Sequence, residues 1–118
     1  MKMLNRSAIN VRLQQPFVDW INNLPGGTEE KITLAEVNQE ATTYLLPELE
    51  DEQDLNTLLE EYHLDLLENE LLSWEEDSQF WPTNRDKHLF TQFLQVELAF
   101  MAFDLDEQTP LLRQSLET

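Results

Sequence analysis

The stretch ELEDEQDLNTLLEEYHLDLLENELLSWEED, residues 48–77, decides the fold. Leu55, Leu59 and Leu66 belong to an apolar series that recurs every three or four residues, which is the spacing of one face of an α-helix. The same stretch has 13 carboxylates and no lysine or arginine. We therefore predict a long acidic helix that begins at an N-cap of Asp51 or Asp54 and packs one face on the rest of the domain.

The apolar face of this helix changes direction near its end. Beyond Leu66 the apolar residues are Leu67, Leu71 and Trp74, and on an ideal helix they are rotated by roughly a third of a turn. This rotation predicts a kink, a break or a second packing partner near residues 68–70.

The outer face of the helix has a row of carboxylates. Glu61, Asp65 and Glu68 stand at positions i, i+4 and i+7. Like charges at this spacing destabilise a helix by about a few tenths of a kcal/mol per pair. Because folding gains nothing from such a row, we interpret it as a candidate binding face.

Composition limits the class of protein. A chain of 118 residues with an apolar fraction of 41% can form one domain with its own core. It has no cysteine and no long apolar run, so we expect a cytoplasmic protein without disulfides or a membrane span. A net charge of −17 repels nucleic-acid phosphates and anionic membranes, so we expect neither as a direct partner.

Three shorter elements are predicted before the acidic helix. Residues 7–14 alternate apolar and polar side chains, as a half-buried strand does. Pro16 can open a helix over residues 16–24, and Thr33 with Glu36 matches a capping box for a short second helix. The β-forming residues 41–46 predict another strand, which Pro47 ends.

Three more features follow the acidic helix. Residues 80–82, Phe-Trp-Pro, predict an aromatic plug over the core. Asn84 is expected to cap a helix that ends near Leu94. Residues 96–103 are apolar on both faces beyond Glu97, which is typical of a central strand, and we expect Phe100 in the core. Arg85 is expected to be partly buried, with a bidentate contact to an acid from residues 48–77.

These elements predict an α+β fold in which helices pack on a small three-stranded sheet, in the order β-α-(short α)-β-α-α-β. We expect one domain over residues 1–105 and a flexible C-terminal tail over residues 106–118. In the tail, Leu111, Leu112 and Leu116 are apolar enough to dock weakly on the domain.

Several short motifs carry a resemblance. They are Gln15-Pro16-Phe17 with Asp19-Trp20, Tyr44-Leu45-Leu46-Pro47-Glu48, Trp81-Pro82 with Arg85, and Val96-Glu97 followed by Phe103-Asp104-Leu105. With them the chain resembles a family of small acidic bacterial cytosolic proteins without an assigned function. The resemblance implies a bacterial cytosolic source and supplies no catalytic or binding residue.

The sequence offers little for catalysis. Glu60 and His63 have the Glu-x-x-His spacing of di-iron helix bundles, but His88 is preceded at that spacing by Arg85, so the second ligand pair is missing. The two glycines follow a helix and do not form a phosphate loop. We therefore expect no enzyme, no metal and no cofactor.

Two functional hypotheses remain. In the first, the protein is an interaction module that binds a basic protein partner through its carboxylates, with imitation of nucleic-acid phosphates as a special case. The candidate residues for this face are Glu61, Asp65, Glu68, Glu75, Glu76 and Asp77. In the second, the acidity only keeps the domain soluble, and function lies on an apolar groove.

Overall fold

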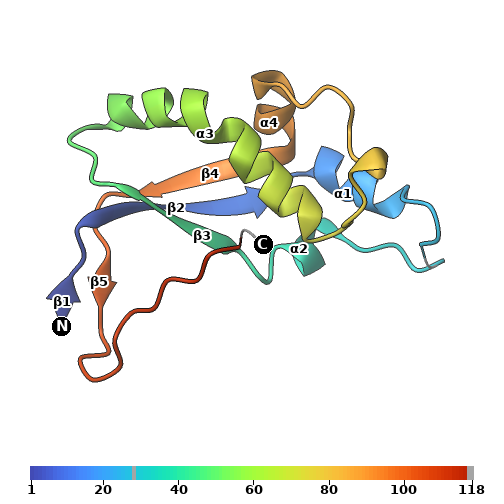
Figure 1. The fold of residues 1–118 in the computed structure, drawn as a ribbon. Coiled ribbons are helices and arrows are strands. Elements are labelled where there is room, and N and C mark those ends of the chain that lie inside the picture. Colours follow the sequence, from blue (N-terminus) through green and yellow to red (C-terminus); the bar gives the residue numbers. More distant parts are fainter. Residues whose placement is uncertain (28, 117–118) are drawn as a thin grey trace.

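The computed structural model describes residues 1–27 and 29–116, which form an α+β fold with helices stacked on a small sheet (Figure 1). In chain order the elements are β1 (Lys2–Met3), β2 (Arg6–Leu13), α1 (Gln15–Asn22), α2 (Leu34–Val37), β3 (Thr42–Pro47), α3 (Glu52–Leu72), the 3₁₀ helix η1 (Ser78–Phe80), α4 (Lys87–Phe93), β4 (Leu94–Ala99) and β5 (Phe103–Asp104). The predicted α+β class and the order of the main elements are confirmed. The sequence did not predict β1, β5 or η1.

The main sheet has the order β3-β2-β4, with both pairings antiparallel. In the central strand β2, Ile9 lies opposite Tyr44 of β3 and Leu98 of β4. The inward side chains of β2 alternate with outward ones such as Arg12. A slip of one residue would turn the whole apolar set to the wrong face, so this alternation fixes the register.

The core lies between this sheet and the helices. Ile9 and Val11 of β2 are completely or almost completely buried, and so are Leu67 and Leu71 of α3. Phe17 of α1 completes the centre of the same cluster, and its ring lies 5.1 Å from that of Phe93, centroid to centroid. The helices are therefore anchored on β2, the strand with partners on both sides.

The acidic helix is shorter than the predicted residues 48–77. It has 21 residues and runs without interruption to Leu72, so of the three alternatives predicted near residues 68–70, a kink, a break or a second packing partner, the break is wrong. On both sides of the rotation the apolar residues are in the core, because Leu66, Leu67 and Leu71 are all buried. Trp74 lies beyond the helix and is exposed, which contradicts its expected place in the core.

The prediction of a central strand at residues 96–103 is wrong. Strand β4 lies at the edge of the sheet and ends at Ala99. After it the chain leaves the main sheet: β5 pairs with β1, and Leu4 N–H donates to the carbonyl of Ala102 at 2.8 Å. This change of partner leaves Phe100 with 39% of its surface exposed, so it is not a core residue.

Two local predictions need smaller corrections. Asp86, not Asn84, is the N-cap of α4, and it accepts a hydrogen bond from Leu89 N–H at 2.9 Å. Asn84 instead donates to the Asp86 carboxylate, at 3.3 Å. In the expected aromatic plug, Trp81 packs on the core while Phe80 is exposed.

Shortening Leu67 should destabilise the protein far more than shortening Phe100. We expect Leu67→Ala to lower the free energy of unfolding by about 2–5 kcal/mol, because a completely buried leucine leaves a cavity. Phe100→Ala should lower it by about 1 kcal/mol or less. Urea denaturation of both variants measures the difference. A Phe100→Ala loss as large as that of Leu67→Ala would contradict the edge position of β4.

Candidate functional site

The acids at the start of α3 have a local structural role. The Asp51 carboxylate accepts hydrogen bonds from the N–H groups of Gln53 (2.8 Å) and Asp54 (3.2 Å). The Asp54 carboxylate accepts in return from Asp51 N–H at 3.2 Å, which completes a capping box. Of the two predicted alternatives, Asp51 is therefore the N-cap, whereas Asp54 is the third helical residue of the capping box. Both charges favour the positive end of the helix.

Two ion pairs join α3 to α4 and to the loop before it. Arg85 Nε donates to Glu68 Oε1 at 3.3 Å. Lys87 pairs with Glu60, and the hydrogen bond and charge of Lys87 lower the pKa of Glu60. Glu60 and Glu68 of α3 thus connect this helix to α4 and to the loop before it.

The predicted partial burial of Arg85 is confirmed, but its predicted bidentate contact is wrong. Its Nη1 donates to the carbonyl of Pro82 at 2.8 Å, so only Nε reaches Glu68. The guanidinium also lies over the Trp81 ring, with Cζ 5.6 Å from the centroid. Arg85 therefore connects α3, the loop before α4 and the aromatic residue on the core.

The outer face of α3 keeps only part of its predicted row. Glu61 and Asp65 are exposed, and neither has a hydrogen bond or ion pair within residues 1–27 and 29–116. Glu68, the third member, is half-buried and bound to Arg85. Of the predicted row, Glu61 and Asp65 are therefore unpaired, whereas the charge of Glu68 is balanced by Arg85.

The acidic run after the helix does not continue this row. Glu75, Glu76 and Asp77 come after Leu72, where helical spacing has ended. Asp77 caps η1 by accepting from Gln79 N–H at 3.1 Å, and Glu75 accepts from Asp77 N–H, also at 3.1 Å. Glu76 is exposed. Of these three carboxylates, Glu76 is the one without a local structural contact in the described residues.

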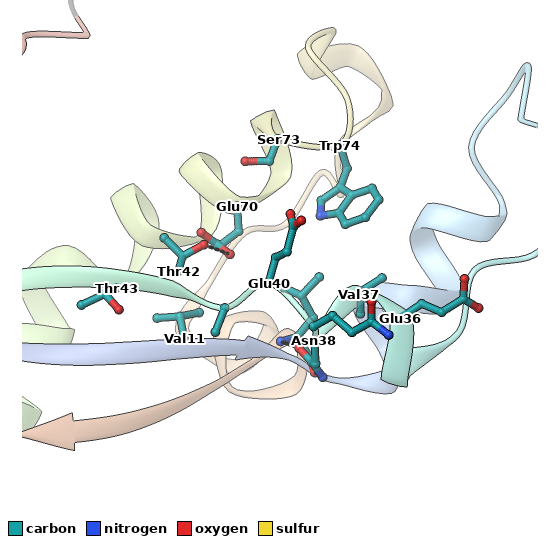
Figure 2. A pocket seen from close by; sticks show the side chains of 13 residues that line it. Val11, Glu36, Val37, Asn38, Glu40, Thr42, Thr43, Glu70, Ser73 and Trp74 are labelled. Carbon is teal, nitrogen blue, oxygen red and sulfur yellow. Dashed lines mark hydrogen bonds between the residues drawn. The ribbon is translucent and has the colours of Figure 1, made fainter.

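A second acidic feature was missed. Glu70, on the inner side of α3, is only 6% exposed and lines a cleft of about 610 Å³ between α3, β3 and the loop after α2. Figure 2 shows the carboxylate of Glu40 entering this cleft from the loop before β3, close to Trp74. The cleft is therefore acidic on both sides.

Glu70 is held by β3. Its carboxylate accepts hydrogen bonds from the Tyr44 hydroxyl and from Thr42 Oγ1, the latter at 3.3 Å. Asn69 Nδ2 donates to the same Tyr44 oxygen at 2.8 Å. Burial raises the pKa of Glu70, although both hydrogen bonds oppose the shift. Burial also raises the pKa of Tyr44, so its hydroxyl keeps its proton and remains a donor.

A signal for Glu70 was present in the sequence. It lies between Leu66, Leu67 and Leu71 at helical spacing, so it belongs to the apolar face of α3. An acid at that position needs hydrogen-bond donors when it is buried. Thr42 and Tyr44 of the preceding strand β3 supply these donors, but only the packing of α3 against β3 shows this.

Metal binding finds no support in the arrangement of side chains. Within the described residues no group of three or more His, Asp or Glu side chains lies close enough to hold a metal ion. The Nδ1 atom of His63 faces the carbonyls of Leu59 (3.2 Å) and Glu60 (3.0 Å) on its own helix. In the Glu-x-x-His pair, Glu60 therefore contacts Lys87, whereas His63 contacts the backbone of its own helix.

Comparison with known proteins returned no relative. No family model, no curated protein and no solved structure matches this chain. Within the described part of the chain, no helix has the length and apolar character needed to cross a membrane. Function is therefore argued from the chemistry of the site itself.

Replacing Glu70 by glutamine should change how stability depends on pH. The folded protein holds the Glu70 proton to a higher pH than the unfolded chain does, because burial raises this pKa. Ionisation of Glu70 therefore removes stability from the parent as the pH rises above the ordinary carboxyl range. Glu70→Gln cannot ionise and keeps a carbonyl for Tyr44.

We accordingly expect the stability of the parent, relative to Glu70→Gln, to fall as the pH rises from about 4 to about 7. Urea unfolding at several pH values measures both proteins, and the other carboxylates cancel in the difference. A difference that stays constant with pH would show that Glu70 titrates normally.

Arg85 and Lys87 should respond differently to conservative exchange. Arg85→Lys should destabilise the protein by about 1 kcal/mol, because an ammonium cannot keep the Glu68, Pro82 and Trp81 contacts together. Lys87→Arg is the control, and its stability should stay within about 0.5 kcal/mol of the parent. Equal losses in thermal unfolding would contradict this role of Arg85.

Proposed function

We propose that this protein is an interaction module that binds a basic protein partner through the outer face of α3. The proposal rests on one observation: Glu61 and Asp65 are exposed and unpaired on a helix whose neighbouring acids Glu60 and Glu68 both have cationic partners. Two free like charges at i, i+4 destabilise a helix slightly. A basic partner would replace this repulsion between the two carboxylates by attraction. We call Glu61 and Asp65 together the carboxylate face.

The charge of the whole chain supports a basic partner. The protein has seven lysines and arginines against 24 acids. Among the described residues, ion pairs join these acids to Arg85, to Lys87 and to the N-terminal ammonium. The unbalanced negative field would speed the approach of a positively charged surface and repel acidic ones. Binding of this kind weakens as salt increases.

Imitation of nucleic-acid phosphates is a special case of this proposal. A helix of 21 residues is about 31 Å long. Its exposed, unpaired carboxylates are Glu52, Glu61 and Asp65. Glu52 and Glu61 are nine residues apart, roughly 13 Å along the axis, whereas phosphates of one DNA strand are roughly 3.4 Å apart. A basic protein surface that needs no phosphate spacing is the better match.

The alternative proposal places function on an apolar groove. It is favoured by a groove of about 450 Å³ between β3 and α3, with mostly apolar side chains from Leu45, Pro47, Tyr62 and Leu66. Asp65 of the carboxylate face lies on the same groove. The two proposals therefore meet at one place on the molecule.

Neutralising the carboxylate face should abolish binding to basic partners. Tagged parent protein and the double variant Glu61→Gln with Asp65→Asn are compared in pull-downs from cell lysate at low and high salt. We expect the parent to retain partners at low salt, and the variant to lose them. Glu68 is left unchanged because its removal would also break the Arg85 ion pair.

The matched control is Glu29→Gln with Glu97→Gln. Both acids are exposed and lie outside α3, and the net charge changes by the same amount. This control should bind like the parent. Equal loss in both double variants would assign binding to net charge alone, and unchanged binding in the α3 variant would refute the proposed face.

A further inference from the structure

The groove between β3 and α3 combines three features of a peptide-binding site. Its floor is apolar, with Leu45 and Pro47 from β3 and Tyr62 from α3. Its rim has the carboxylate of Asp65, which has no partner in the described residues. We call this site the β3–α3 groove.

The third feature is the open edge of the sheet. Strand β3 pairs with β2 on one side, and in the described chain no strand pairs with its other side. An unpaired edge presents backbone N–H and C=O groups to any extended segment beside it. Proteins that bind extended peptides in this way use the edge for affinity and neighbouring pockets for alternate side chains.

The C-terminal segment of the chain reaches this groove. It runs from the β1–β5 sheet back towards β3 (Figure 1), and Leu116 is one of the residues that line the groove. Its start is held by the ion pair between the Met1 ammonium and Glu107. Leu111 lies in a hollow that Met3 also lines. Two points of the segment therefore rest on the domain.

The chemistry of the segment suits the groove. Residues 108–116, QTPLLRQSL, contain three leucines and Arg113 but no acid, in a chain with a net charge of −17. The groove offers an apolar floor to Leu116 and also includes Asp65, with Glu61 one helical turn away. Both the apolar character and the charge of the groove therefore suit the C-terminal segment.

We propose that the end of the described chain, residues 113–116, is the resident occupant of the β3–α3 groove through Leu116, and that it occupies the groove in exchange with a partner segment of the same chemistry, an extended apolar stretch with an arginine. The exchange with a partner rests on the proposed function, whereas the docking of the segment does not. Leu116 is 84% exposed, so its contact is shallow. A tethered segment has an effective concentration of roughly millimolar, so a segment whose own affinity is no better than millimolar leaves the groove open to a partner segment that binds more tightly.

A disulfide trap tests the docking. The chain has no cysteine, so two introduced cysteines have no competitors. The test pair is Tyr62→Cys with Leu116→Cys. The control pair is Leu64→Cys with Leu116→Cys, because Leu64 is exposed to almost the same extent as Tyr62, 40% against 38%, but does not line the groove. Mild oxidation is followed on non-reducing gels at low protein concentration.

We expect the test pair to close within one chain at least about tenfold faster than the control pair. Equal rates would overturn the docking. Disulfides that form mainly between two chains would also overturn it, because they would assign the groove to the segment of a second copy.

The exchange is tested with a fluorescent peptide of the sequence QTPLLRQSL. Reduced Tyr62→Cys/Leu116→Cys protein should bind it, and binding should fall at least about tenfold once the disulfide holds the segment in place. Peptide binding that is unaffected by the disulfide would overturn the exchange. Failure of the carboxylate-face pull-down with a positive disulfide trap would refute the proposed function while leaving the docking intact.

Discussion

The structure depends on the packing of the second half of α3 against β2. Leu67 and Leu71 are completely buried, and so is Ile9 of the central strand. All three belong to one cluster with Phe17. Each fully buried leucine or isoleucine contributes roughly 1.5–3 kcal/mol, so a domain of this size depends on a few such contacts. Phe90 and Phe93 of α4 join the same cluster, whereas β3 is placed by its antiparallel pairing with β2.

This packing divides α3 into two parts with different roles. Its second half is buried and includes Glu70, which α3 can bury only because Tyr44 and Thr42 of β3 donate to it. Its first half is less deeply packed, and there Leu55 and Leu59 are only partly buried. Glu61 lies near the transition, on the solvent side. Asp65, the other member of the carboxylate face, directly precedes the buried Leu66, so the face lies next to the part of the helix that is anchored in the core.

The sequence predicted those elements whose signals are local. Alternation marked β2, and the Thr33 capping box is present as predicted, with Thr33 Oγ1 accepting from Glu36 N–H at 3.2 Å. Helical spacing marked α3, although its acidic flanks extended the prediction past Leu72. Such patterns involve residues that are close together in the sequence, so they can be recognised without knowledge of the fold.

Features that depend on distant contacts could not be predicted in the same way. An apolar run indicates burial but not whether a strand is central or at an edge, and Phe100 was misplaced for this reason. The role of Glu68 depended on Arg85, and that of Glu70 on Tyr44. The candidate face was therefore predicted as six carboxylates, of which Glu61, Asp65 and Glu76 are exposed without a local contact in the described residues.

Amide hydrogen exchange along α3 tests the division of this helix most directly. Local opening exposes lightly packed turns before the core unfolds, so exchange rates rank the two halves. The account predicts that amides of residues 66–71 exchange most slowly, close to the rate set by global unfolding, and that amides of residues 56–61 exchange clearly faster. Equal protection along the helix, or slower exchange in its first half, would contradict the claim that the second half supports an exposed carboxylate face.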